Sequence, residues 1–253
     1  MIDAPRRHQI TRVRREIQRR SVTVGAVERL SPNMIRVRFE GDDLRTFEST
    51  GADDHVKLFV PDPASEAGRA MRDYTPRSFD TEAGTLVIDF AIHDAGPATR
   101  WATEAKVGDT IAIGGPRGSA VLTDDFDWYL LIGDETALPS IARRLEELRP
   151  GVPVTTIIAV EEDGDRLELP VREELTVVWS PRAGQPVDDA ERLRTAITAL
   201  PAGEGYVWIA AEGKVARALR AHVVDVLGHP KAWTKAAGYW SQGSADSHET
   251  ITD

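Results

Sequence analysis

The first half of the chain alternates apolar and polar residues over short stretches. The stretches with this two-residue period, separated by Gly, Pro or Asn, are residues 21–30, 34–41, 54–62, 85–94 and 108–118. Alternation of this kind predicts strands that are buried on one face. Short strands at this spacing indicate a small antiparallel β-barrel. One helix, over residues 96–105, is expected to interrupt the strands.

The second half of the chain changes to continuous apolar runs that alternate with amphipathic stretches. Strands are expected at residues 128–134, 152–160, 174–180 and 205–211, and helices at 136–148, 188–200 and 212–227. This alternation predicts a parallel sheet with helices on both faces, and residues 235–243 are expected to add an edge strand. The predicted fold is therefore mixed β and α/β. A basic arm (1–20) precedes an antiparallel β-barrel (21–122), and a doubly wound parallel α/β domain (123–253) follows.

Composition and charge narrow the class of protein. The chain is 41% hydrophobic and 28% charged, as is typical of soluble globular proteins. No stretch approaches the roughly 20 apolar residues of a membrane helix, and the first residues carry arginines without an apolar core, so we expect a cytoplasmic protein with no membrane span. The net charge of −10 argues against a nucleic-acid partner. The arginine-rich arm is read as solvated and partly disordered, with a nucleic-acid or membrane contact as the less favoured alternative.

The absence of cysteine removes several kinds of chemistry at once. With no cysteine in the sequence, disulfides, thiolate catalysis, Cys-ligated zinc and Cys-held iron–sulfur clusters are excluded. The histidines follow no metal-binding spacing, which makes a structural metal site unexpected, and no GxSxG motif of a hydrolase occurs. Redox chemistry in this chain would need a bound organic cofactor or an iron held by other ligands.

A first candidate site lies in the stretch "RAMRDYTPRSFD", residues 69–80. Arg72 and Tyr74 share one face of the predicted strand, and Thr75 lies on the other. A fixed positive charge, an aromatic ring and a hydroxyl together suit a flat polar ligand that carries phosphate. A plain surface strand is the alternative for this stretch alone.

A second candidate site follows in "TLVIDFAIHDAGPATRW". Asp89 and His93 point away from the apolar face of their strand, toward solvent or a ligand. The helix after them begins with Pro97, Ala98 and Thr99, and its first turn offers free N–H groups and a positive dipole end, which suit a phosphate. An exposed polar strand face is the simpler alternative.

A third candidate site lies where the strand over residues 128–134 ends. Gly133 closes the strand, Thr136 is expected to cap the next helix, and ligands of open α/β sheets bind at such strand ends. No GxGxxG or P-loop is present, and Asp134 and Glu135 would repel a phosphate placed there. Only the position of these residues at a strand end, and no sequence motif, therefore indicates a ligand site here.

Taken in order, these motifs resemble one family. The segments "RDYTPRSFD", "DFAIHDAGPATRWA", "VGDTIAIGGPRG", "YLLIGDETALPSIARRLEEL" and "GYW" are similar to those of the siderophore-interacting proteins. These are flavin-dependent ferric-siderophore reductases of the ferredoxin-reductase-like superfamily. The resemblance extends over residues 21–243.

The resemblance implies that the barrel binds FAD. Arg72 would pair with the pyrophosphate, Tyr74 would pack on the isoalloxazine ring, and Thr75 would lie near the reactive edge of the ring. The other implied cofactor contacts are Asp89 and His93 on the adenosine or ribityl side, Pro97, Ala98 and Thr99 on the pyrophosphate with Trp101 packed nearby, and Thr136 beside the flavin and the nicotinamide.

The resemblance also implies a reaction and its partners. NADPH or NADH would deliver hydride to FAD, and the reduced flavin would pass electrons to a ferric siderophore, with a reduced ferredoxin as the alternative donor. Lys57, Arg117 and Lys235 are the candidates for a positive mouth that receives the chelate; a solvated lysine and a tight-turn arginine are the alternatives for the first two. Arg182 could meet a 2′-phosphate, although a surface arginine is the simpler reading. We expect a monomer.

One departure and two alternatives stay open at this point. Family members often carry basic residues after "YW", where this chain has Ser241 and Gln242, which indicates a different or less anionic siderophore. A flavin reductase with another acceptor, such as a ferredoxin or a quinone, is the nearest alternative. A non-catalytic siderophore-binding protein is the alternative from another class.

Overall fold

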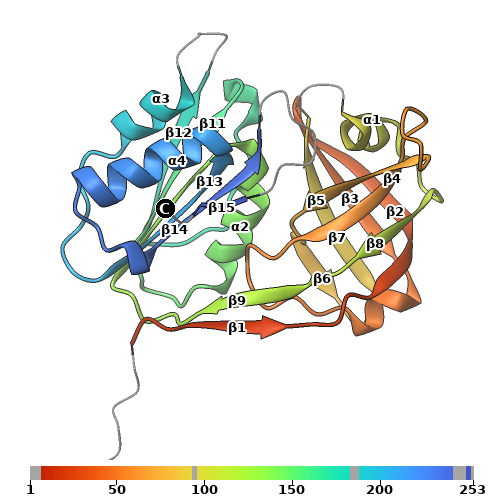
Figure 1. Cartoon of the computed structure of the whole chain (residues 1–253), viewed down its shortest axis with the longest axis horizontal. Coiled ribbons are helices and arrows are strands. Elements are labelled where there is room, and N and C mark those ends of the chain that lie inside the picture. Colours follow the sequence, from red (N-terminus) through yellow and green to blue (C-terminus); the bar gives the residue numbers. More distant parts are fainter. Residues whose placement is uncertain (1–6, 93–95, 183–187, 242–248, 252–253) are drawn as a thin grey trace, which may run out of the picture.

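The computed structural model describes residues 7–92, 96–182, 188–241 and 249–251. Two parts lie side by side, a β-barrel and an α/β domain, and a ribbon of two strands runs along the base of both (Figure 1). The predicted order of an antiparallel β part followed by an α/β part is confirmed. Among the described residues, no helix is long and apolar enough to cross a membrane.

The barrel is a seven-stranded antiparallel sheet with the order β5-β4-β8-β2-β3-β7-β6. Its strands are β2 (Arg19–Ser31), β3 (Met34–Glu40), β4 (Val56–Pro61), β5 (Arg69–Tyr74), β6 (Ser78–Asp80), β7 (Thr85–Ala91) and β8 (Thr110–Gly114). The two end strands, β5 and β6, are consecutive along the chain, and only Thr75, Pro76 and Arg77 join them. The backbone N–H of Arg77 donates to the carbonyl of Val87 at 2.9 Å. The first candidate stretch is therefore the seam at which the chain closes the sheet.

The inward side chains of these strands form the barrel core, as their two-residue period predicts. Phe39, Leu58, Ile88 and Phe90 are completely buried there. Helix α1 (Pro97–Glu104) closes one end of the barrel by packing Ala98 and Ala102 onto this core, and the other short helix of the barrel is the 3-10 turn η1 (Asp42–Thr46).

The second sheet has the order β12-β11-β10-β13-β14-β15. The strands β10 (Trp128–Gly133), β11 (Val154–Val160), β12 (Leu175–Pro181), β13 (Gly205–Glu212) and β14 (Thr234–Trp240) are parallel, and β15 (Glu249–Ile251) is antiparallel to β14. The strand expected at residues 235–243 is present as β14, but its expected position at the edge of the sheet was wrong, because β15 pairs with its outer side. A strand of only three residues is too short to show a period in the sequence.

Helices cover both faces of this sheet. Helix α2 (Leu138–Glu147) lies on the face toward the barrel, and α3 (Asp189–Ala196) and α4 (Gly213–Ala221) lie on the opposite face (Figure 1). The core under α2 also includes Met34 and Ala91 of the barrel, so the two parts share one apolar cluster. The short turns of this domain are η2 (Glu135–Ala137), η3 (Asp163–Asp165), η5 (Lys231–Trp233) and the π-turn η4 (His222–Val226).

The basic arm differs from the expected solvated segment from Arg7 onward. Residues Ile10–Arg14 form strand β1, which pairs antiparallel with β9 (Gly118–Leu122). The His8 ring stacks on Phe126 with centroids 4.0 Å apart, and its nitrogens lie 3.0 Å from carboxylate oxygens of Asp125 and Glu204. The run of arginines concealed this strand, because its order comes from a partner more than 100 residues away. Residues 1–6 lie outside the described residues.

Candidate functional site

A chain of hydroxyl groups connects the barrel seam to the α/β domain. The Thr75 hydroxyl lies 3.0 Å from the hydroxyl of Ser140 on α2, and Ser140 lies 3.1 Å from the phenol of Tyr239 on β14. Thr75 and Ser140 are 7% and 2% exposed. Burial raises the pKa of Tyr239, so its phenol stays protonated. The sequence singled out Thr75, but it gave no indication that Ser140 and Tyr239 would meet it.

The other members of the first candidate site, Arg72 and Tyr74, lie at the end of β5 just before Thr75. The Tyr74 ring packs against Phe90 with centroids 4.4 Å apart, and burial raises the pKa of its phenol. The Arg72 guanidinium donates to the carbonyl of Met71 at 2.7 Å and makes no ion pair with any residue that the structure describes. A cation that is not neutralised therefore lies beside an aromatic side chain on the barrel surface.

The first turn of α1 has the features that the sequence predicted for a phosphate site. Gly96 caps the helix in an extended conformation with no side-chain hydrogen bond, Pro97 is in the first turn, and no acidic residue is present there. Trp101 leans on the barrel wall, with ring centroids 6.0 Å from Phe39 and 5.7 Å from Phe90. His93 lies outside the described residues.

Asp89 does not face solvent. It is 5% exposed, and the Arg36 guanidinium donates to its two carboxylate oxygens at 2.7 and 2.8 Å. This hydrogen bond raises the pKa of Arg36. The polar face of β7 is occupied by an ion pair across to β3, because adjacent strands of the sheet bring the two side chains into register.

At the end of β10, the cap is Asp134 rather than Thr136. The Asp134 carboxylate accepts from the backbone and hydroxyl of Thr136, from the backbone N–H of Glu212 at 3.1 Å and from the indole of Trp240 at 2.9 Å. It thereby fixes the ends of β10, β13 and β14 at the point where the strand order reverses, which is where α/β sheets bind ligands. A Cβ on Gly133 would lie 2.4 Å from Ala137, so only glycine lets the helical turn begin directly above this strand end.

Arg182 is engaged by carboxylates rather than poised for a 2′-phosphate. It donates to Asp189 at 2.6 Å and pairs with Glu135. Burial raises the pKa of Glu135 to about 7, despite its hydrogen bond with Arg182. Arg182 is therefore part of a partly buried ion cluster beside the end of β10.

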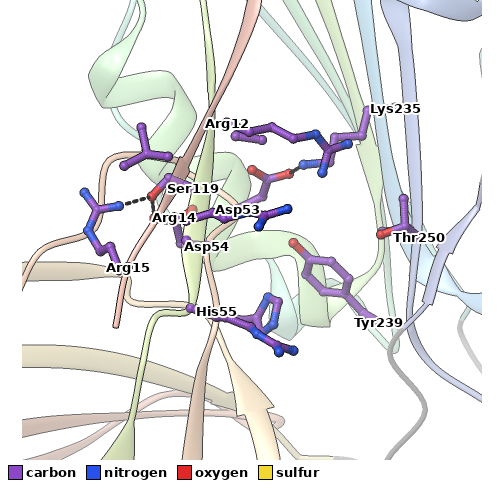
Figure 2. A pocket seen from close by; sticks show the side chains of 15 residues that line it. Arg12, Arg14, Arg15, Asp53, Asp54, His55, Ser119, Lys235, Tyr239 and Thr250 are labelled. Atoms are coloured by element: carbon purple, nitrogen blue, oxygen red, sulfur yellow. Dashed lines mark hydrogen bonds and ion pairs between the residues drawn. The ribbon is translucent and has the colours of Figure 1, made fainter. Parts of the chain in front are cut away.

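A cavity of about 620 Å³ lies between the barrel and the α/β domain, and the β1–β9 ribbon forms one of its walls (Figure 2). Tyr239, the last member of the hydroxyl chain, lines it. The ionisable acidic and basic side chains of the lining, apart from Tyr239, are Arg12, Arg14, Arg15, Asp53, Asp54, His55, Arg117 and Lys235. Cations from distant parts of the chain thus converge on one space that adjoins the seam.

The predicted substrate residues are only partly brought together. Arg117 and Lys235 line the cavity, and Lys235 is ion-paired with Asp53. Lys57 is paired with Asp73 at 3.0 Å and is not part of the lining. Sequence reasoning missed Arg12 and Arg14; their alternation in "RVR" was a visible sign of a strand, but only the pairing with β9 shows which side they face.

The described residues include no group of three or more His, Cys, Asp or Glu side chains that could hold a metal ion. The groups that they do present, an arginine without an ion pair beside an aromatic ring and a helix start with no acidic residue in its first turn, fit a phosphate-bearing aromatic cofactor. An antiparallel barrel followed by a parallel α/β sheet is the fold of the ferredoxin reductases.

Comparison with known proteins gives the family. The model of the siderophore-interacting protein matches residues 126–243, and that of the siderophore-interacting FAD-binding domain matches residues 23–69 and 63–120. The chain belongs to the siderophore-interacting protein family. FAD is the cofactor of this domain, which confirms the cofactor that the resemblance implied.

Individual relatives agree over nearly the full length. The chain is 34% identical to the NADPH-dependent ferric-chelate reductase of Escherichia coli, covering 95% of this chain and 99% of that protein. It is 27% identical to the ferric vibriobactin reductase of Vibrio cholerae, covering 85% of this chain and 86% of the relative. The solved structure of a siderophore utilization protein from T. fusca superimposes with a TM-score of 0.87 at 32% identity, covering 94% of this chain and 98% of that one.

Proposed function

We propose that this protein is an FAD-dependent ferric-siderophore reductase that takes hydride from NADPH or NADH and reduces chelated Fe(III) to Fe(II). The observation that carries this proposal is the cation-lined cavity that adjoins the hydroxyl chain of Thr75, Ser140 and Tyr239. A cluster of cations in a chain of net charge −10 suits an anionic substrate. The relatives named for ferric-chelate and ferric vibriobactin reduction support the same substrate class.

The barrel would hold the cofactor through the groups described above. Arg72 and the first turn of α1 at Pro97, Ala98 and Thr99 would bind the pyrophosphate, because the guanidinium offers charged N–H donors and the helix start is the positive end of the helix dipole. Tyr74 would pack on the flavin ring, and Thr75 would orient the edge of the ring that faces the cavity. When bound, FAD accepts two electrons as hydride and releases them singly, which joins a nicotinamide donor to a one-electron ferric acceptor.

The remaining cofactor candidates are proposed in supporting positions. Asp89 would hold Arg36 and the wall formed by β3 and β7, and Trp101 would brace α1 against that wall. Thr136, held by Asp134, would face the nicotinamide at the strand ends. His93 is proposed, as before, to contact the adenosine or ribityl side of FAD.

The proposed reaction transfers hydride and electrons and needs no general acid or base from the protein. One hydride carries two electrons and therefore reduces two ferric chelates, each Fe(III) gaining one electron. Hard oxygen donors hold Fe(II) less tightly than Fe(III), so the metal leaves the chelate after reduction. The residues must bind and orient the chelate, and we propose that Arg117 and Lys235 do so because both line the cavity.

Anaerobic reduction followed by reoxidation tests this function. The holoenzyme is bleached with NADPH or NADH under argon, and ferric chelates are added with a dye that traps Fe(II). We expect reoxidation of the flavin matched by two trapped Fe(II) per flavin. If a nicotinamide bleaches the protein but no chelate reoxidises it, the substrate assignment is wrong; if only reduced ferredoxin bleaches it, the donor is wrong.

We also propose that the protein works as a monomer in the cytoplasm, where nicotinamide donors are available. The exposed large apolar residues that the structure describes, among them Ile17, Val107, Val171 and Val226, belong to separate segments of the chain. Light scattering after size exclusion should give a mass near 27.8 kDa. A dimer mass would contradict the proposed monomer.

A further inference from the structure

We propose that strand β1 forms part of the chelate site, with Arg12 and Arg14 as substrate-binding residues, and that this site prefers polyanionic chelates such as a tris-catecholate complex of Fe(III). The inference rests on the proposed function and assigns its substrate class. Arg12 and Arg14 add to Arg117, the cation of this cavity that was expected from the sequence and that, like them, has no carboxylate partner among the described residues.

The position of β1 directs these two side chains into the cavity. Residues two apart on a strand share a face, and Arg12 and Arg14 extend to the side of Asp53 and Lys235, whereas Arg15 points the opposite way (Figure 2). Both arginines have exposed side chains at the cavity, so a ligand can reach them.

Pairing with β9 fixes the position of β1. Its residues pair in register with β9, Arg12 opposite Ala120 and Arg14 opposite Gly118. A Cβ on Gly118 would lie 2.4 Å from the carbonyl oxygen of Val13, so glycine is required for the two strands to approach this closely. The His8 contacts fix the segment just before β1.

The acidic residues of the cavity are already satisfied. Asp53 is paired with Lys235 and accepts the indole N–H of Trp208 at 3.0 Å. Asp54 is 4% exposed and accepts hydrogen bonds from Ser49 at 2.8 Å and Ser119 at 2.6 Å.

Most arginines of the lining, in contrast to its aspartates, have no partner of opposite charge among the described residues. Arg15 is held by Glu48 at 3.2 Å. Within the part of the chain that the structure describes, the guanidinium groups of Arg12, Arg14 and Arg117 have no ion pair or hydrogen bond. The cavity therefore presents three guanidinium charges that no carboxylate of the lining neutralises.

Three such charges favour an anion over a neutral ligand. Guanidinium groups donate paired N–H groups to carboxylate or catecholate oxygens, and a tris-catecholate complex of a trivalent metal carries three negative charges on such oxygens. In open water at physiological salt, dissolved ions screen the attraction between charges over a distance of about 8 Å. Charges that the protein partly encloses, such as those along the cavity walls, are screened less. Because Ser241 follows "YW" where family members often carry a basic residue, the sequence indicated a less anionic chelate. The arginines of β1 supply positive charge to the cavity from a different part of the chain.

Gallium complexes test the inference without turnover, because Ga(III) has the charge of Fe(III) and is not reduced under these conditions. Titration calorimetry on the FAD-loaded protein would compare a tris-catecholate complex, charge 3−, with a neutral tris-hydroxamate complex. The test variant is Arg12→Gln/Arg14→Gln. The control is Arg166→Gln/Arg194→Gln, which removes the same charge from two exposed positions outside the cavity, one directly after η3 and one on α3.

We expect the wild type and the control to bind the trianion more tightly than the neutral complex. The β1 variant should lose about tenfold in affinity for the trianion, equivalent to about 1.4 kcal/mol, and keep its affinity for the neutral complex. Arg12→Lys/Arg14→Lys should recover part of the loss, since it restores charge without the forked donors. Unchanged FAD content and thermal midpoint would show that the β1 variant is folded.

Contrary results separate the two proposals. If the β1 variant binds the trianion as the wild type does, β1 is not part of the site, although the reductase function stands. If the wild type binds both complexes equally, the proposed preference for polyanionic chelates is wrong. This test uses only the wild type and therefore does not depend on the folding of the β1 variant. If the wild type reduces no ferric chelate of either charge, the proposed function itself fails.

Discussion

Replacing Arg143 by methionine should destabilise the junction between the two parts of the molecule. Arg143 lies on α2 and is 5% exposed. Its guanidinium donates to the hydroxyl of Ser49 at 2.7 Å, the carbonyl of Ser49 at 2.8 Å, the carbonyl of Pro76 at 3.2 Å and the carboxylate of Glu147 at 2.7 Å. Methionine fills a similar volume but leaves these acceptors without their donor.

The size of the effect follows from how deeply each acceptor is buried. Glu147 is partly exposed and can return to water, so its contribution is about 0.5 kcal/mol. The carbonyls of Ser49 and Pro76 are held at the junction, and each buried acceptor that loses its partner costs about 1–3 kcal/mol. Because water can reach part of the space left by the shorter side chain, we take the lower part of this range. The expected loss in the free energy of unfolding is about 3 kcal/mol.

Urea unfolding followed by both tryptophan fluorescence and circular dichroism measures this loss. Arg194→Met on the exposed face of α3 is the control, and it should change the free energy of unfolding by less than about 0.5 kcal/mol. Arg143→Lys should fall between the two, because a lysine can reach some of the acceptors but not all of them. FAD should also be released at lower urea in Arg143→Met, because Pro76 adjoins Thr75. A midpoint equal to that of the control would refute the reasoning, since the contacts of Arg143 would then carry no net stability.

Three further predictions concern the site. Arg72→Ala should weaken FAD binding about tenfold or more, since it removes a charged donor; an unchanged flavin titration of the apoprotein would show that Arg72 is not a phosphate ligand. Asp53→Asn should strengthen binding of the gallium trianion about threefold, because it leaves Lys235 unpaired in the cavity, and weaker binding would contradict this charge balance. The pKa of Glu135 is raised to about 7 from 4.5 by burial. The folded state therefore holds this proton more tightly, and stability should fall as pH rises between about 4.5 and 7, by up to about 3 kcal/mol. In Glu135→Gln this component should be missing when urea midpoints at pH 5 and pH 8 are compared with those of the wild type. An identical pH dependence in the two proteins would mean that Arg182 keeps Glu135 ionised throughout.

Much of the fold was predictable because each strand and helix shows its own period. The alternation in "MIRVRFE" and the apolar run "WYLLIG" correspond to β3 and β10, whose burial follows from local sequence. The missed strands include β1 and β9, which pair with each other across more than 100 residues, and β15, which has only three residues. Local pattern contains no information about distant pairing, and a strand of three residues is too short to show a period.

The site was predictable where one short segment supplies several groups and unpredictable where the fold brings groups together. Arg72, Tyr74 and Thr75 stood out because they are neighbours in the sequence. The meeting of Thr75 with Ser140 and Tyr239 depends on the packing of β5, α2 and β14, and no spacing reveals it. The same holds for Asp89, whose partner Arg36 comes from the adjacent strand.

The contacts between the barrel and the α/β domain matter for the proposed reaction, although their side chains would take no part in electron transfer. If the reaction moves single electrons, no side chain needs to transfer a proton to the metal, and the rate depends on the distance from flavin to chelate. That distance is set by the contacts that hold the cavity beside the seam. Arg77 pairs with Glu146 at 2.6 Å, and Asp165 accepts from Ser31 at 2.8 Å and from the Asn33 side chain at 2.9 Å, each across the junction. Residues that touch neither cofactor nor chelate would then control the reaction through position, which is why the Arg143 variants test function as well as stability.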